Sequence, residues 1–202
     1  MNTNELILQA GKEEFLIKGF EGASLRTIAA SAGVTTGAIY GYYVDKSALF
    51  EALVEPAASE FHSQFMNAQN SFQELPKEEQ VKSMLNSSNE PLQYLLDYIY
   101  DHFDSFQLIA CSSSGTKYEY YIEELVHVET EATYRFWEVL NEMGYHPAHL
   151  TKNLVHILSN AYFSAIFETV AHGMEKEEAD QYVAHLTKFF WSGWHALMIN
   201  EK

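Results

Sequence analysis

A short run near the N-terminus carries side chains suited to contact nucleic acid. It comprises Thr35, Thr36, Gly37, Ala38, Tyr40 and Tyr42. Threonine and tyrosine hydroxyls can bond base edges or phosphates, and the methyl groups of threonine and alanine can touch thymine methyls. A glycine among them lets the backbone approach DNA closely. The run predicts a surface that enters the major groove.

Two short helices are expected to hold this run in place. The apolar residues of the first recur at helical spacing and are Leu25, Ile28, Ala29 and Ala32. Ser24 is a capping residue for this helix, and Gly33 supplies the left-handed residue that ends it. Thr35 then caps a second helix through residues 36–43. Two short helices joined by a tight turn containing glycine predict a helix-turn-helix.

The rest of the chain is also expected to be helical. Only ten glycines and four prolines occur among 202 residues, and 47% of the residues are hydrophobic, so the composition predicts an all-α fold with a substantial core. Besides the two short helices, we expect a helix over 4–18 that ends at Gly19, and one from Lys46 toward residue 70 that is bent or interrupted at Pro56. Three more are expected farther along the chain. They are 117–143 closed by Gly144, one opened by Pro147 and ending near Gly173, and 176–200.

Charge and cysteine content indicate which part of the chain can face DNA and in which compartment we expect the protein. The net charge is −16, but residues 1–50 hold four basic and five acidic side chains, so −15 of the charge belongs to residues 51–202 and the DNA-facing part is nearly neutral. Cys111 is the single cysteine, which favours a reducing cytoplasm. The N-terminal segment fits neither a signal peptide nor a membrane span, so we expect a cytoplasmic protein without membrane contact.

The stretch from Gly22 to Phe50 closely resembles the DNA-binding head of the tetracycline-repressor (TetR) family. The resemblance covers the spacing from Ser24 to Gly33, the Ile39-Tyr40 pair and the Asp45-Lys46 start of the next helix. It implies a DNA-binding domain over 1–45 and a helical ligand-binding and dimerisation domain over 46–202. It also implies that Arg26, Thr27 and Lys46 contact phosphates, which completes the predicted DNA surface.

The resemblance implies an effector pocket in the larger domain, where aromatic residues crowd residues 92–137. The candidate pocket residues are Tyr98, Phe103, Phe106, Tyr121, Tyr134 and Phe163. An ordinary core role remains open for each of them. Glu124, Glu131 and Glu138 repeat every seven residues, which suits either a cationic effector or a solvated face.

Other chemistries find little support in the sequence. His149 and His156 share a helical face but lack a third ligand, so no metal and no cofactor is expected. No phosphate loop or nucleophile elbow is present, and we expect no enzyme. Surplus apolar residues over about 150–200 predict a homodimer interface.

The predicted function is a ligand-responsive transcription regulator, a repressor released from a palindromic double-stranded operator by a small-molecule effector. The alternative is a dimeric DNA-binding protein that is regulated by a protein partner.

Overall fold

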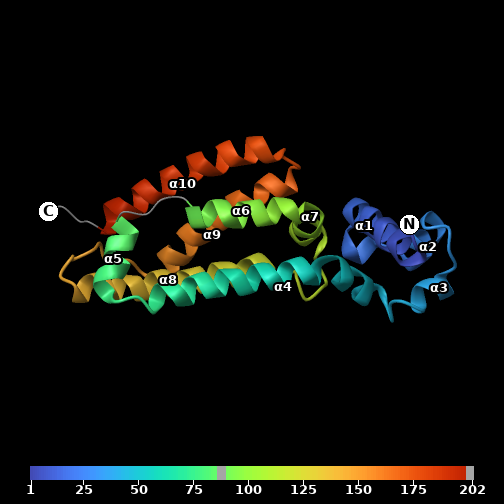
Figure 1. Ribbon diagram of the computed structural model, residues 1–202, viewed down its shortest axis with the longest axis horizontal. Helices are drawn as coiled ribbons and strands as arrows, with labels where there is room; N and C mark the ends of the chain where they lie inside the picture. The colour runs from blue at the N-terminus through green and yellow to red at the C-terminus, as the bar shows by residue number, and fades with distance from the viewer. Residues whose placement is uncertain (86–89, 199–202) are drawn as a thin grey trace. The chain divides into compact units, whose positions relative to one another are not determined.

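The computed structural model describes residues 1–85 and 90–198, and its regular elements there are α-helices (Figure 1). This confirms the predicted all-α fold. The helices are α1 (Thr3–Gly22), α2 (Leu25–Ser31), α3 (Thr36–Tyr40), α4 (Lys46–Gln73), α5 (Lys77–Leu85), α6 (Glu90–Asp101), α7 (Phe103–Ser112), α8 (Tyr121–Glu142), α9 (Lys152–Ala171) and α10 (Lys176–Met198).

Several helix ends differ from the sequence predictions. Helix α3 ends at Tyr40 rather than at residue 43, and α8 begins at Tyr121 rather than near residue 117. Gly19 does turn the chain, with φ of 68°, but one further helical turn follows and α1 ends at Gly22. Pro147 does not open α9, and that prediction is wrong. The helix begins at Lys152 because the Thr151 hydroxyl accepts a hydrogen bond from the Leu154 amide. Ahead of it, the Ala148 amide donates to the carbonyl of Leu197, which holds the segment in a non-helical conformation.

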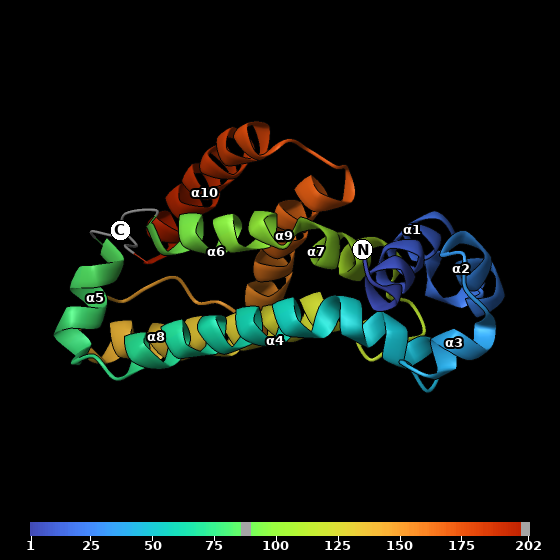
Figure 2. The same ribbon diagram turned by 45° about the vertical axis from the view of Figure 1, so that its right-hand side comes forward.

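The chain divides into two compact units, and the first comprises residues 1–61 and 101–121. Figures 1 and 2 show α1, α2 and α3 gathered together at the N-terminal end of α4. Phe15, Phe20 and Phe50 form an aromatic cluster with ring centres 5.1–6.0 Å apart. Gly11 permits close contact between α1 and α4, because a Cβ atom there would lie 3.2 Å from Leu49.

Proline lies within α4 without ending it, as Pro56 is an internal residue of the helix. Proline lacks an amide hydrogen, so the carbonyl of Ala52, four residues earlier, loses its usual helical partner. Side chains from 101–121 bond the neighbouring turns. Ser105 donates to the Leu53 carbonyl over 2.8 Å, and Tyr121 donates to the Ala58 carbonyl over 2.8 Å. These two hydrogen bonds connect residues 101–121 to α4 on both sides of Pro56.

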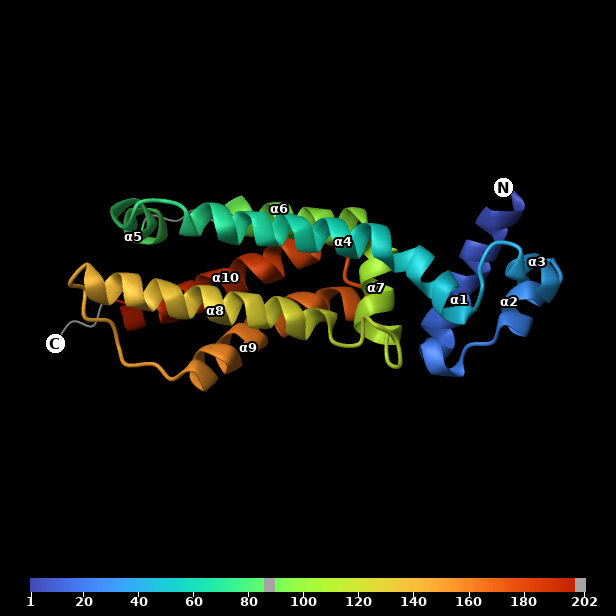
Figure 3. The ribbon, with the colours of Figure 1, turned by 90° about the horizontal axis from the view of Figure 1, so that it is seen from below.

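The second unit comprises residues 62–100 and 122–202. Within it, α8 runs alongside the C-terminal part of α4, and α9 lies next to α10 (Figures 1 and 3). One cluster of buried residues consists of Val81, Phe136, Trp137, Leu140, Leu150, Val155 and Met198. The Trp137 indole donates to the Ala148 carbonyl over 2.9 Å, which satisfies its polar edge within the core.

Helix α9 is long and apolar enough to cross a membrane by length and composition alone. Its residues Val155, Phe163, Phe167 and Val170 are buried in the second unit. A core helix of a globular protein can have the same length and composition.

Candidate nucleic-acid interface

Two side-chain caps and one glycine build the helix-turn-helix. Ser24 accepts from the Arg26 amide over 3.3 Å, and Thr35 accepts from the Ala38 amide over 3.1 Å. Gly33 takes the left-handed conformation, with φ of 68°. The Val34 amide then donates to the Ala29 carbonyl over 2.9 Å and closes the turn. The caps and the turn glycine lie where the sequence predicted them.

The inner faces of the two short helices are closed by apolar packing. Ile28 and Ile39 are fully buried, and Ala29 and Ala32 are almost so. Two tyrosines that follow Ile39 lie outside this packing: Tyr40 is 56% exposed and Tyr42 is 53% exposed. Packing therefore does not account for these two side chains, although it accounts for their apolar neighbours.

The structure brings most of the predicted DNA-contacting residues to this outer surface. Thr35, Gly37, Tyr40, Tyr42 and Arg26 are exposed, whereas Thr27, Thr36, Ala38 and Lys46 are half-buried. The Thr35 oxygen already accepts the capping bond, so its hydroxyl hydrogen is what it can offer a phosphate or base. The nine residues span α2, the turn, α3 and the start of α4, and their contacts with DNA stay a prediction.

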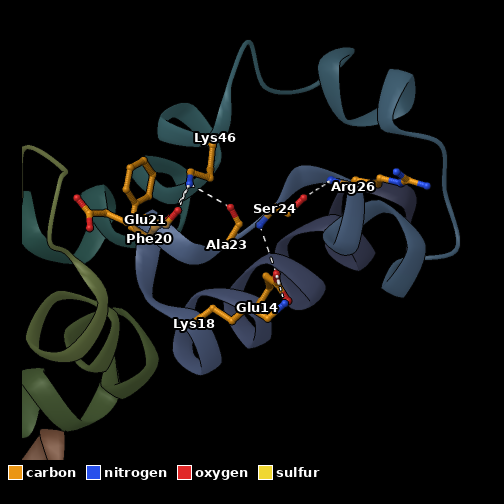
Figure 4. A network of polar contacts seen from close by, with 8 residues as sticks. All are labelled: Glu14, Lys18, Phe20, Glu21, Ala23, Ser24, Arg26 and Lys46. Carbon is orange, nitrogen blue, oxygen red and sulfur yellow. Dashed lines mark hydrogen bonds and ion pairs between the residues drawn. The ribbon is translucent and has the colours of Figure 1, made fainter.

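The basic side chains near this surface differ in whether an acidic side chain pairs with them. Arg26 projects outward in Figure 4, and its side chain forms no ion pair within the described part of the chain. Lys18 instead lies 3.3 Å from Glu14, whose carboxylate also accepts a hydrogen bond from the Ser24 amide over 3.3 Å. Of these two cations, Arg26 is the more available to a phosphate.

Lys46 is engaged by the end of α1 (Figure 4). Its ammonium donates to the carbonyls of Phe20, Glu21 and Ala23 over 2.6, 3.1 and 3.0 Å. It also lies 4.5 Å from the centre of the Phe20 ring. An ammonium has three N–H donors, so all of them have acceptors here. The phosphate contact predicted for Lys46 stays a prediction, and it requires the ammonium to leave at least one carbonyl.

Sequence reasoning missed this role of Lys46 and a second one, that of Tyr43. The Tyr43 hydroxyl donates to the Asn4 side chain over 2.7 Å, which ties the segment after α3 to the start of α1. Burial raises the pKa of Tyr43, with a smaller opposing effect from this hydrogen bond. The four consecutive aromatic and glycine residues around Tyr43 gave no signal to single it out.

The six predicted effector-pocket residues fall into different units. Phe103, Phe106 and Tyr121 belong to the first unit, whereas Tyr98, Tyr134 and Phe163 belong to the second. Phe106 packs edge-on to Phe61 with ring centres 5.3 Å apart, and the Tyr121 hydroxyl donates a hydrogen bond to the Ala58 carbonyl of α4. Both residues therefore have structural roles. Tyr134 is 37% exposed. The assignment of these residues to an effector pocket stays a prediction.

The N-terminal region matches known proteins. Residues 7–53 match the family model described as bacterial regulatory proteins, tetR family. Over 52 residues the chain is 42% identical to the HTH-type transcriptional repressor BepR of Brucella suis biovar 1 (strain 1330). That alignment covers 26% of this chain and 25% of the repressor, so the match spans about a quarter of the curated relative.

Solved structures match over nearly the whole chain. A transcriptional regulator of the TerR/AcrR family from Aquifex aeolicus VF5 has a TM-score of 0.55 and 18% identity, and the alignment covers 93% of this chain and 99% of that one. A TetR-like transcriptional regulator from Rhodococcus sp. RHA1 has a TM-score of 0.52 and 20% identity over 95% and 94% of the two chains. These likenesses establish the fold, and the family match itself covers residues 7–53, which contain the helix-turn-helix.

Proposed function

We propose that this protein is a dimeric transcription regulator that binds a palindromic operator through α2 and α3. The observation that carries the proposal is the exposed threonine, glycine and tyrosine surface over a core that Ile28 and Ile39 already close. A surface of small and hydroxyl-bearing residues suits the major groove, and an exposed Arg26 beside it suits the phosphate backbone. The relative BepR is named a transcriptional repressor, which supports repression as the sign of control.

The second copy is proposed to pack against α9 and α10. Ile157 is 61% exposed and Phe189 is 73% exposed, which is high for large apolar side chains. Phe189 lines a groove of about 640 Å³ together with residues that include Leu158, Phe190, Trp194 and Leu197. A two-fold interface would cover this apolar surface with the same surface of another copy.

A dimer gives the operator its symmetry. Two heads that enter successive major grooves require half-sites about 34–36 Å apart, which is one helical turn of DNA. An effector bound in the helical domain is proposed to move the heads away from this spacing and release the operator. The protein would act in the cytoplasm, where its DNA lies.

Selection from a random pool of duplex DNA tests the proposal. The full chain should enrich one sequence with two-fold symmetry and half-sites one helical turn apart. Sedimentation should give a dimer at micromolar concentration, and Phe189→Asp should shift it toward monomer and weaken operator binding. Enrichment of no sequence, or a stable wild-type monomer, would show that the proposed function is wrong.

A further inference from the structure

The carboxylate of Glu129, in the second unit, accepts its hydrogen bonds from uncharged side chains. Glu129 on α8 accepts a hydrogen bond from the Gln69 side chain of α4 over 2.7 Å and one from the Thr133 hydroxyl over 3.3 Å. Across the residues that the structure describes, no lysine, arginine or histidine pairs with it. Burial raises the pKa of Glu129, and its two hydrogen bonds oppose this only in part.

Aromatic rings lie on the helices beside this carboxylate. Phe65, one turn before Gln69 on α4, packs edge-on to Phe163 of α9 with ring centres 5.7 Å apart. Tyr162 lies 6.2 Å from Phe163 and shares a 2.9 Å hydrogen bond with Thr187. Burial raises the pKa of Tyr162 to about 12, the hydrogen bond with Thr187 opposes this increase, and the nearby charge of Glu129 adds a smaller increase.

The polar members of this group still present surface. Gln69, Glu129, Thr133 and Tyr162 are half-buried, whereas Phe65 and Phe163 are buried. Glu129 therefore combines surroundings that penalise its charge with a position that is not fully closed to solvent. That combination differs from a carboxylate sealed in a core, which has nothing left to bind.

We propose that Glu129 recognises a positively charged group on the effector, so that the effector is an organic cation with an apolar body. An unpaired carboxylate in protein surroundings is costly, and an ammonium that reaches it would offset the cost by charge pairing. The aromatic rings on α4 and α9 would contact the apolar body and attract the cation through their π faces. This inference rests on the proposed function, because it names the chemical class of the proposed effector.

Three probes of equal length test the charge requirement: the 4-phenylbutyltrimethylammonium cation, the uncharged alcohol 5-phenylpentan-1-ol, and the anion 5-phenylpentanoate. Calorimetry on the full chain without DNA should show the cation binding about tenfold or more tighter than the alcohol, and the anion binding most weakly. Glu129→Gln removes the charge and keeps the size. It should weaken cation binding by about tenfold and change alcohol binding little.

Matched variants separate recognition from general charge and from folding. Glu124→Gln makes the same change on an exposed face of α8 and should leave all three affinities unchanged. Glu129→Asp keeps the charge and should keep the preference for the cation. No cation binding, or equal affinities for cation and alcohol in wild type, would overturn the inference, as would an unchanged preference in Glu129→Gln.

Operator binding is measured on the same samples. Glu129→Gln should bind the selected operator as wild type does, because residue 129 lies outside the proposed DNA surface. If the wild type binds its operator but shows no preference for the cation, the effector class is wrong and the proposed regulator stands. If the cation is preferred but no operator is found, the proposed function fails and the cation site stands.

Discussion

The ammonium of Lys46 donates to the carbonyl of Phe20 over 2.6 Å and lies 4.5 Å from the centre of the ring of the same residue. The first residue of α4 thereby caps the last turn of α1. Gly19, with φ of 68°, turns the chain so that several carbonyls of this segment face one cation. The Phe20 ring in turn packs edge-on to Phe50 at 5.5 Å.

This arrangement predicts a stability role for Lys46. Lys46→Met removes the donor of three hydrogen bonds and one cation–π contact, and should lower the free energy of unfolding by about 1–2 kcal/mol. Urea denaturation of wild type and variant measures the change. Lys82→Met, which removes a side chain paired with Glu79 at 3.8 Å and 69% exposed, is the control and should cost less than about 0.5 kcal/mol. Equal costs for both variants would exclude the capping role.

Arg26 should control the salt dependence of DNA binding. Its exposed guanidinium is free to neutralise one phosphate per head, so Arg26→Ala should reduce the log–log salt slope by about 2 per dimer and weaken all sequences alike. Fluorescence anisotropy of labelled operator across a salt series gives the slope. The same series with Lys46→Met tests the phosphate contact predicted for that residue, which requires a similar reduction. An unchanged slope for Arg26→Ala would place the phosphate contacts elsewhere.

A polar network beside Pro56 should make stability depend on pH. Hydrogen bonds from Tyr118 and then from Lys117 hold the pKa of Glu55 below its ordinary value. A lowered folded-state pKa stabilises the protein above the unfolded pKa of about 4, and this contribution is lost as the pH falls through the folded value.

Glu55→Gln should therefore lower the free energy of unfolding by about 0.5–1 kcal/mol at pH 7. The figure is modest because the side chains of Lys117 and Glu55 are 54% and 43% exposed, so water screens their charges. The difference should shrink as the pH falls below the ordinary glutamate pKa of about 4, and disappear once the wild-type carboxyl is protonated as well. Thermal melts across this pH range give the comparison, with exposed Glu74→Gln as control. A deficit that persists at low pH would attribute the effect to packing rather than charge.

The head was largely predictable because its determinants are local. Ser24, Gly33 and Thr35 act within a few residues of their own positions, and the apolar spacing of Ile28 and Ala29 defines the buried face of one helix. The start of α9 has a local signal in its capping residue Thr151, but the non-helical segment ahead of it was not predictable, because it depends on the hydrogen bond from Ala148 to Leu197, which is distant in sequence. The inclusion of residues 101–121 in the first unit was also not predictable, because it too depends on contacts between residues distant in sequence. An ion pair between Lys12 and Asp104 at 2.6 Å joins two segments that no local pattern connects.

The sequence did contain a signal for Glu129 that went unused. Leu125 and Val126 are buried, and residue 129 lies four and three positions after them, on the same face of α8. A glutamate at that position is an acid on the apolar face. The heptad of Glu124, Glu131 and Glu138 drew attention to a different face of the same helix. The partner of Glu129, Gln69, is sixty residues away, so the hydrogen bond itself needed the structure.

Gly37 gives the most direct test of the claim that α3 contacts base edges. A Cβ atom added there meets only the Thr35 hydroxyl, at 3.7 Å, so the fold accepts alanine. Alanine in place of glycine within a helix should raise the free energy of unfolding by about 0.5–1 kcal/mol. On DNA the added methyl group should block the approach of the backbone. We predict that Gly37→Ala melts at or above the wild-type temperature and loses about tenfold or more in operator affinity, with binding to random duplex unchanged. Wild-type operator affinity in this variant would contradict the account.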